Sequence, residues 1–158
     1  MTQHKDITPP PLSIAINRTI RFEEIDITGV LWHGHYISLF EEARVAFGDT
    51  YGLSYKNFIK YKTIAPVVKL AIEYKTPLRF QDNITIIATL HWSESLKFNF
   101  SYWILKDKKI ATIANSTQVL TDIKGNLLFI PPRWIKDFLE KWKTGKIQSQ
   151  YTLPTIIS

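Results

Sequence analysis

The sequence predicts a single α+β domain in which an antiparallel sheet curls around one long helix. Its 158 residues are 45% apolar, which suits one domain with a substantial core. One strand pattern and one long helical pattern are followed by four strand patterns and a short helix. Runs of strands without alternating helices favour an antiparallel α+β arrangement over a doubly wound one. The long helix has a strongly apolar face, which a curved sheet would cover.

The first part of the chain supplies one strand and the long helix. Residues 1–12 end in Pro9-Pro10-Pro11 and are expected to form a flexible leader. Apolar and polar residues alternate over 13–23, which predicts a strand. Apolar side chains at helical spacing predict a helix that ends at Gly48 or Gly52; they are Tyr36, Phe40, Ala43 and Phe47.

The rest of the chain reads as strands and then a short helix. Alternation or β-rich composition predicts strands over 67–74, 83–91, 96–105 and 110–122. The aromatic stripe Trp134, Phe138 and Trp142 predicts an amphipathic helix after Pro131-Pro132 that ends at Gly145. The domain is therefore expected to span 13–145, followed by a tail over 146–158.

Composition and missing motifs exclude several function classes. The chain lacks Cys, so thiolate nucleophiles, disulfides and Cys-bound metals are ruled out. No nucleotide-binding glycine loop, GxSxG or HExxH motif occurs. The net charge of +6 suits anionic partners, but on charge alone a solvated basic surface is the preferred interpretation. The aromatic residues fall at core-like spacings, so we expect no nucleic-acid site. No apolar run approaches the ~20 residues of a membrane helix, and a signal peptide is absent, so the cytoplasm is the expected location.

The segment Glu24 to Tyr36 is the strongest candidate for chemistry. Asp26 precedes a predicted helix start, where unpaired backbone N–H groups can hold a developing oxyanion. A carboxylate beside such a point can attack an acyl group or activate water. The same letters, Asp26-Ile27-Thr28-Gly29, are also typical of a purely structural type I turn. His33 is likewise either a functional imidazole or a capping or core residue, and His33 with His35 lacks a third metal ligand, so no metal site is predicted.

Two stretches resemble the hotdog-fold acyl-CoA thioesterases, in particular the 4-hydroxybenzoyl-CoA thioesterase and Tol–Pal-associated types. The first runs from Phe22 to Arg44 and contains Asp26-Ile27-Thr28-Gly29-Val30, His33, Tyr36 and Phe40-Glu41-Glu42-Ala43-Arg44. The second is Ile72 to Asp82, with Tyr74-Lys75-Thr76-Pro77. The resemblance spans roughly residues 14 to 140. It implies a five-stranded antiparallel sheet wrapped around a long helix, in agreement with the order read from the sequence.

The resemblance also implies site residues and an assembly. Asp26 would be the catalytic nucleophile or general base, with His33 beside it and the His33 N–H polarising the thioester carbonyl. Expected substrate-binding residues are Gly29, Trp32, Tyr36, Pro66, Val67 and Val68, and the packing of Phe47 and Tyr51 would help to set pocket depth. Lys62, Lys75, Arg79 and Arg133 are candidates for the coenzyme A phosphates. Relatives work as homodimers or homotetramers (dimers of dimers) with sites at subunit interfaces, and they need no cofactor beyond the CoA of the substrate.

The sequence thus predicts hydrolysis of an acyl-CoA or acyl-carrier-protein thioester to a free acid and a thiol. Two alternatives stay open at this level: a non-catalytic hotdog protein that binds acyl groups, and a hotdog hydratase or dehydratase acting on acyl thioesters. The amino-acid sequence does not specify which acyl group is hydrolysed.

Overall fold

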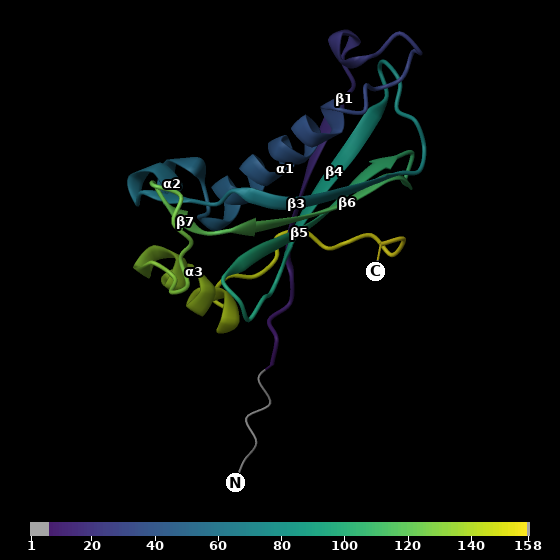
Figure 1. Cartoon of the computed structure of the whole chain (residues 1–158). Coiled ribbons are helices and arrows are strands. Elements are labelled where there is room, and N and C mark those ends of the chain that lie inside the picture. The colour runs from purple at the N-terminus through teal and green to yellow at the C-terminus, as the bar shows by residue number, and fades with distance from the viewer. Residues whose placement is uncertain (1–6, 158) are drawn as a thin grey trace.

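The computed structural model describes residues 7–157 (Figure 1). Four helical segments are formed: η1 (Phe22–Glu24), α1 (His35–Tyr51), α2 (Tyr55–Lys60) and α3 (Arg133–Lys143). The strands are β1 (Leu12–Thr19), β2 (Thr63–Ile64), β3 (Val67–Tyr74), β4 (Asn83–His91), β5 (Lys97–Lys106), β6 (Lys109–Val119) and β7 (Thr121–Asp122).

Five of these strands form one antiparallel sheet in the order β1-β4-β5-β6-β3. β5 and β6 are joined by the two-residue turn Asp107-Lys108, whose φ values of 49° and 61° match the tight turns that favour hairpins. β2 and β7 pair separately as a short two-stranded ribbon. The sheet curves beside α1, so the predicted α+β class and the five-stranded antiparallel sheet around a long helix are confirmed (Figure 1).

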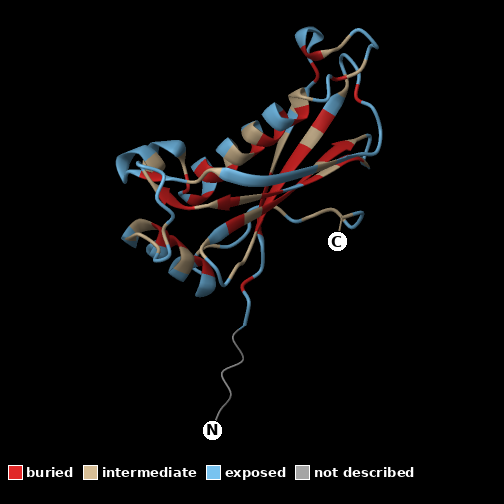
Figure 2. Cartoon of the chain, viewed as in Figure 1, coloured by how far each residue is buried: buried red, intermediate tan, exposed pale blue. Residues whose placement is uncertain are grey.

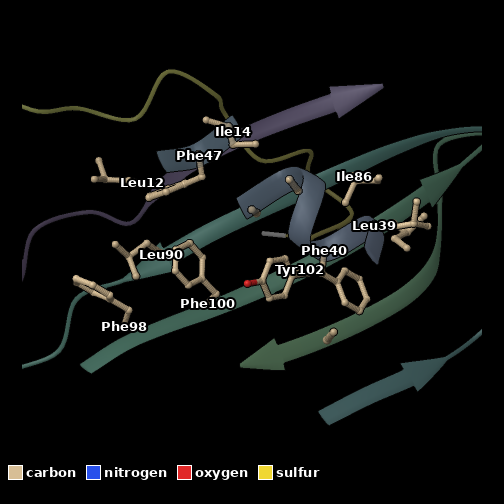
Figure 3. Close-up of a cluster of buried hydrophobic side chains, with 14 of the residues drawn as sticks. Leu12, Ile14, Leu39, Phe40, Phe47, Ile86, Leu90, Phe98, Phe100 and Tyr102 are labelled. Atoms are coloured by element: carbon tan, nitrogen blue, oxygen red, sulfur yellow. The ribbon is translucent and has the colours of Figure 1, made fainter. Parts of the chain in front are cut away.

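The core lies between α1 and the inner face of β4 and β5 (Figure 3). Phe40 stacks on Tyr102 with ring centroids 5.0 Å apart, and Phe47 meets the edge of Phe100 at the same separation. The predicted apolar face of the helix therefore packs on aromatic side chains of the strand predicted over 96–105. The four predicted α1 side chains are all buried: Tyr36, Phe40, Ala43 and Phe47.

Several element boundaries differ from the sequence prediction. β1 ends at Thr19, and the η1 turn takes over the rest of the predicted first strand. α1 continues through Gly48 and stops at Gly52, which is left-handed with φ 89°. Gly48 lies against the backbone of Leu53, where a Cβ atom would be 2.4 Å from the carbonyl oxygen. α2 and β2 were not predicted, and the strand predicted over 110–122 is divided into β6, which ends at Val119, and β7, which pairs with β2.

Both flanking segments contact the domain where the structure describes them. Residues 1–6 of the predicted leader lie outside the described part. β1 begins at Leu12, one residue before the expected boundary, and Trp142 Nε1 on α3 donates to the carbonyl of Pro10 at 2.8 Å. In the predicted tail, Ser149 Oγ accepts from the backbone N–H of Ser13 at 3.0 Å.

β3 is an edge strand, and its side chains are mostly exposed (Figure 2). Val67, Val68, Leu70 and Tyr74 are 43%, 59%, 37% and 49% exposed. One row of backbone hydrogen-bonding groups on β3 has no partner strand within residues 7–157. Natural proteins rarely leave a long apolar edge uncovered. None of the helices in the described residues is long and apolar enough to cross a bilayer.

Candidate active site

Asp26 lies in a tight turn between η1 and α1. The backbone N–H of Gly29 donates to the carbonyl of Asp26 at 3.0 Å, and Gly29 has φ 81°, which suits glycine. The Asp26 N–H donates to the Val30 carbonyl at 2.9 Å. The predicted Asp-x-x-Gly turn is thus present, and it presents the Asp26 side chain in a half-buried position.

One oxygen of the Asp26 carboxylate is held by Thr28. Asp26 Oδ1 accepts from the Thr28 backbone N–H at 2.8 Å and from Thr28 Oγ1 at 2.5 Å. The hydroxyl of Thr28 is the largest cause that lowers the pKa of Asp26, with the Thr28 and Val30 backbones and His33 acting in the same direction. The carboxylate is therefore ionised at neutral pH. Oδ2 accepts no hydrogen bond from residues 7–157 and is available for chemistry.

The start of α1 offers free backbone donors close to this turn in the chain. Within residues 7–157, the N–H groups of His33 and Gly34 donate no hydrogen bond. They precede a helix of 17 residues, whose aligned peptide dipoles give its beginning a positive partial charge. Unpaired donors at such a point can stabilise an oxyanion.

Trp32, His33 and His35 form an aromatic group at the helix start. The Trp32 ring lies 5.1 Å from His33 and 5.4 Å from His35 between centroids. Gly34 allows this packing, because a Cβ atom there would come within 2.3 Å of the Trp32 ring. His33 is exposed, so it is not a core residue.

Tyr74, at the end of β3, ties this helix start to the sheet. Its Oη donates to the His33 carbonyl at 3.1 Å, and its ring meets Tyr36 edge-on at 4.8 Å. Tyr36 is buried, which raises the pKa of its phenol. Sequence reasoning did not assign Tyr74 a role at the site, because this contact joins residues 41 positions apart.

A buried ion pair supports the other side of the turn. Arg18 on β1 pairs with Glu24, and the two side chains are only 10% and 8% exposed. Glu24 Oε2 also accepts from the Arg21 N–H at 2.8 Å, and the Glu24 carbonyl accepts from the Trp32 N–H at 3.0 Å. Although burial opposes ionisation, these hydrogen bonds and the Arg18 charge keep the pKa of Glu24 below its usual value.

Not every predicted site residue lies near Asp26 in one chain. Pro66, Val67 and Val68 are at the start of β3, whereas the Asp26 turn adjoins its end through Tyr74. A rise of about 3.3 Å per residue places the two ends of this strand roughly 23 Å apart. A single chain therefore does not bring these apolar residues to the carboxylate.

The four basic candidates also divide into two groups. Lys75 and Arg79 lie in the segment after β3 that contacts the helix start, where Leu31 donates to the Leu78 carbonyl at 2.7 Å. Lys62 follows α2 and Arg133 begins α3; Tyr61 and Trp134, their chain neighbours, stack at 5.3 Å. Lys75 is paired with Glu73 on the surface.

A large apolar pocket lies at the opposite end of α1 from Asp26. Its volume is about 560 Å³, and its lining comes from the second half of α1, from α2, from β2 and from the inner face of the sheet. Phe47, which was expected to affect pocket depth, lines it, whereas Tyr51, Pro66, Val67 and Val68 do not. No local sequence pattern predicts this pocket, because its walls come from separate elements.

Comparison with known proteins places this geometry in a family. The profile of the thioesterase-like superfamily matches residues 20–141. The chain belongs to the thioesterase-like superfamily. This stretch contains the Asp26 turn, α1 and four of the five strands of the large sheet; β1 lies just before it. The predicted family resemblance is thereby confirmed.

Individual members of the superfamily are similar over most of their length. A 1,4-dihydroxy-2-naphthoyl-CoA hydrolase of Rippkaea orientalis is 25% identical, covering 73% of this chain and 80% of its own. The acyl-CoA thioester hydrolase of Escherichia coli is 23% identical, with 78% and 91% covered. The crystal structure of a hypothetical protein from Aquifex aeolicus is 27% identical, covers 82% of this chain and 98% of its own, and superposes with a TM-score of 0.73.

Proposed function

We propose that this chain hydrolyses acyl-CoA thioesters to a free acid and coenzyme A, with Asp26 as the reacting carboxylate. The observation that carries the proposal is the pairing of an ionised carboxylate with free N–H groups of a helix start, on one short loop. The family match and the names of the relatives support thioester hydrolysis.

Each group has a defined part in this reaction. The thioester carbonyl oxygen would accept from the His33 N–H, and the helix dipole would favour the oxyanion that forms there. Asp26 Oδ2 would either take a proton from an attacking water or attack the carbonyl carbon itself. The C–S bond then breaks and the CoA thiolate leaves, taking up a proton; in the nucleophilic route, water afterwards hydrolyses the mixed anhydride. The His33 imidazole beside Trp32 would orient the substrate.

A two-fold dimer through β3 is part of the proposal. The exposed apolar edge strand supports it, because a second β3 running antiparallel would pair the open hydrogen-bonding groups and bury Val68 and Leu70. The two-fold axis of this dimer places the start of β3 in one protomer beside the end of β3 in the other. Pro66, Val67 and Val68 of one protomer would then lie near the Asp26 turn of its partner.

The same axis would gather the basic residues. Lys62 and Arg133 of one protomer would approach the end of the partner's β3, where Lys75 and Arg79 are located. CoA carries several phosphates, so a cationic rim at this opening would attract it. An acyl-carrier protein, whose acyl group is also a thioester, is the alternative carrier.

Thiol release from a panel of short, medium, long and aromatic acyl-CoAs tests the proposal. We expect release with at least one of these classes. Hydration of crotonyl-CoA without thiol release would favour the hydratase alternative, and binding of the thioesters without any turnover would favour the non-catalytic one; either outcome contradicts the proposal. The cytoplasmic location and the division into leader, domain and tail remain predictions.

A further inference from the structure

The pocket beside α2 has a buried inner wall and an exposed rim. Phe47, Phe98 and Phe100 of the inner wall are each less than 5% exposed. Val45, Ile59, Ile64 and Ile123 form much of the rim and are 39% to 78% exposed. The volume of about 560 Å³ falls within the roughly 300–1,000 Å³ typical of small-molecule sites. The pocket is therefore open, apolar and large enough for a small organic group.

The buried polar side chains of the pocket wall, Thr63 and Gln118, are hydrogen-bonded within the chain. Thr63 Oγ1 donates to the Tyr61 carbonyl and accepts from Trp134 Nε1, both at 3.1 Å. The Gln118 side-chain amide donates to the Ala65 carbonyl. A hydroxyl group entering the pocket would lose its bonds to water and find these donors occupied.

Three further polar side chains line the pocket. Lys62 lies at its exposed rim, whereas Arg44 and Tyr55 satisfy each other through Glu41. Tyr55 Oη donates to Glu41 Oε2 at 2.7 Å, and the Arg44 guanidinium pairs with the other Glu41 oxygen. Arg44 Nε and Nη1 are buried and have no hydrogen-bond partner among the described residues. The ion pair is neutral as a unit, so it does not create a site for an anion.

The position of the pocket fits the proposed dimer. Ile64 and Ala65 in its wall directly precede β3, and Gln118 pairs with Val67. The Asp26 turn of the same chain adjoins the far end of β3, but the turn of a two-fold partner would adjoin this end. The two-fold axis of the proposed dimer is perpendicular to the sheet, so the α1 helices of both protomers lie on the same side of the joined sheet. The partner's Asp26 turn and this pocket would therefore open into the same space between the two helices.

We propose that this pocket receives the acyl group of the thioester and selects unsubstituted apolar acyl groups over hydroxylated ones. The inference rests on the proposed function, and it names the substrate class that the Asp26 site takes. Val45 and Ile59 at the rim would be specificity-determining residues. Each additional methylene buried in the pocket is worth a factor of up to about four in kcat/KM.

Hydrolysis rates across defined substrates test the selection. The probes are acetyl-CoA, hexanoyl-CoA, decanoyl-CoA and 1,4-dihydroxy-2-naphthoyl-CoA. We expect kcat/KM for decanoyl-CoA to exceed that for hexanoyl-CoA, and that for the dihydroxynaphthoyl thioester, by about tenfold or more. Smaller ratios, or a preference for the hydroxylated substrate, would overturn the proposal.

Substitutions that fill the pocket provide a second test of the proposal. Val45→Phe and Ile59→Trp each add bulk at the rim, and Ile156→Phe is the control because Ile156 is 50% exposed and outside the pocket. The rim variants should lower kcat/KM for decanoyl-CoA about tenfold while acetyl-CoA stays within about twofold. An equal loss for both substrates, in proteins with unchanged circular dichroism, would show that the acyl chain does not enter here.

A binding measurement separates failure of the pocket from failure of the hydrolase. Titration calorimetry of decanoyl-CoA and acetyl-CoA into Asp26→Asn should give a Kd about tenfold lower for the decanoyl thioester, and adding Val45→Phe should remove the difference. If wild-type protein hydrolyses nothing but this difference persists, the pocket stands and the hydrolase assignment falls. If hydrolysis occurs but the difference is absent, the pocket proposal falls.

Discussion

Thr28 Oγ1 donates to Asp26 Oδ1 at 2.5 Å, which leaves Oδ2 as the open oxygen of the carboxylate. This contact connects the turn to its chemistry. A carboxylate with one occupied oxygen has a fixed orientation, and its lowered pKa keeps it ionised. Thr28 lies two residues after Asp26, where an Asx turn brings a donor to the carboxylate.

Replacing Thr28 should change the pH dependence of hydrolysis. Because its pKa is lowered, the Asp26 carboxylate is protonated only at a pH below the ordinary Asp pKa of about 3.9. Thr28→Val removes the hydroxyl, so the acidic limb of the kcat/KM profile should move to higher pH, while Thr28→Ser should keep the wild-type limb. Profiles measured over the pH range in which circular dichroism shows a folded protein decide this. If the acidic limbs of the wild type, Thr28→Val and Thr28→Ser coincide, a reacting role for Asp26 is contradicted.

The same shift has a consequence for stability. A carboxyl group with a lowered folded-state pKa stabilises the fold above its unfolded pKa, and this contribution is lost as the pH falls through the folded value. The stability of Thr28→Val should therefore depend less steeply on pH in the acid range than that of the wild type. Urea unfolding at a series of pH values measures the slope.

Gly34 should be intolerant of a side chain as long as Trp32 is present. A methyl group would lie within 2.3 Å of the Trp32 ring, so Gly34→Ala must displace the indole from the His33 and His35 rings at the site. We expect kcat/KM to fall roughly 10- to 100-fold, since small displacements at a reacting centre are costly. Trp32→Ala combined with Gly34→Ala removes the clash and should recover part of the loss; a double variant no better than Gly34→Ala would refute this explanation.

The Arg18–Glu24 pair should contribute strongly to stability when only one partner is removed. Because both side chains are almost covered, Arg18→Met leaves an uncompensated buried carboxylate and should cost about 3–5 kcal/mol in the free energy of unfolding. Arg18→Met with Glu24→Leu removes both charges and should regain most of that loss. Urea denaturation of the two proteins provides the comparison, and equal stability of the two would argue against a buried pair.

A charge on β3 should dissociate the proposed dimer. Leu70→Lys places an ammonium on the open edge of the sheet, where lysines typically oppose strand pairing. We expect a monomer in sedimentation velocity and at least about tenfold slower hydrolysis. Asn17→Lys is the control, because Asn17 is exposed on β1, the opposite edge strand. An active monomer of Leu70→Lys would eliminate the interface from the mechanism.

Sequence patterns located the elements whose signals are local. β3 and β4 have the predicted bounds, since Pro66 and Thr76-Pro77 punctuate one of them and β-rich composition marks the other. α2 escaped prediction because none of its six residues is buried, so it carries no apolar period. Two glycines offered an end for α1. The helix ends at Gly52, which is left-handed, whereas Gly48 stays helical and its missing side chain lets Leu53 approach.

The site was only partly accessible to the same reasoning. The Asp26 turn and the helix start are contiguous in sequence, so their chemistry is readable there. Two features of the site are formed by segments that are distant in the sequence: the contact between Tyr74 and His33, and the pocket beside α2. No local sequence pattern predicts either of them. Asp122-Ile123-Lys124-Gly125 forms a similar turn with a lowered Asp122 pKa, which shows that the turn letters do not identify a catalytic residue by themselves.

That second turn supplies the control for the most direct measurement, which is thioester hydrolysis by Asp26→Asn compared with Asp122→Asn. The Asp122 carboxylate accepts from the backbone N–H groups of Lys124 and Asn126 and from the Asn126 side-chain amide, so both of its oxygens are occupied. Asp26→Asn should lower kcat by about a thousandfold or more with the fold unchanged, while Asp122→Asn should hydrolyse within about twofold of the wild type. Turnover by a folded Asp26→Asn protein equal to that of Asp122→Asn would contradict the account.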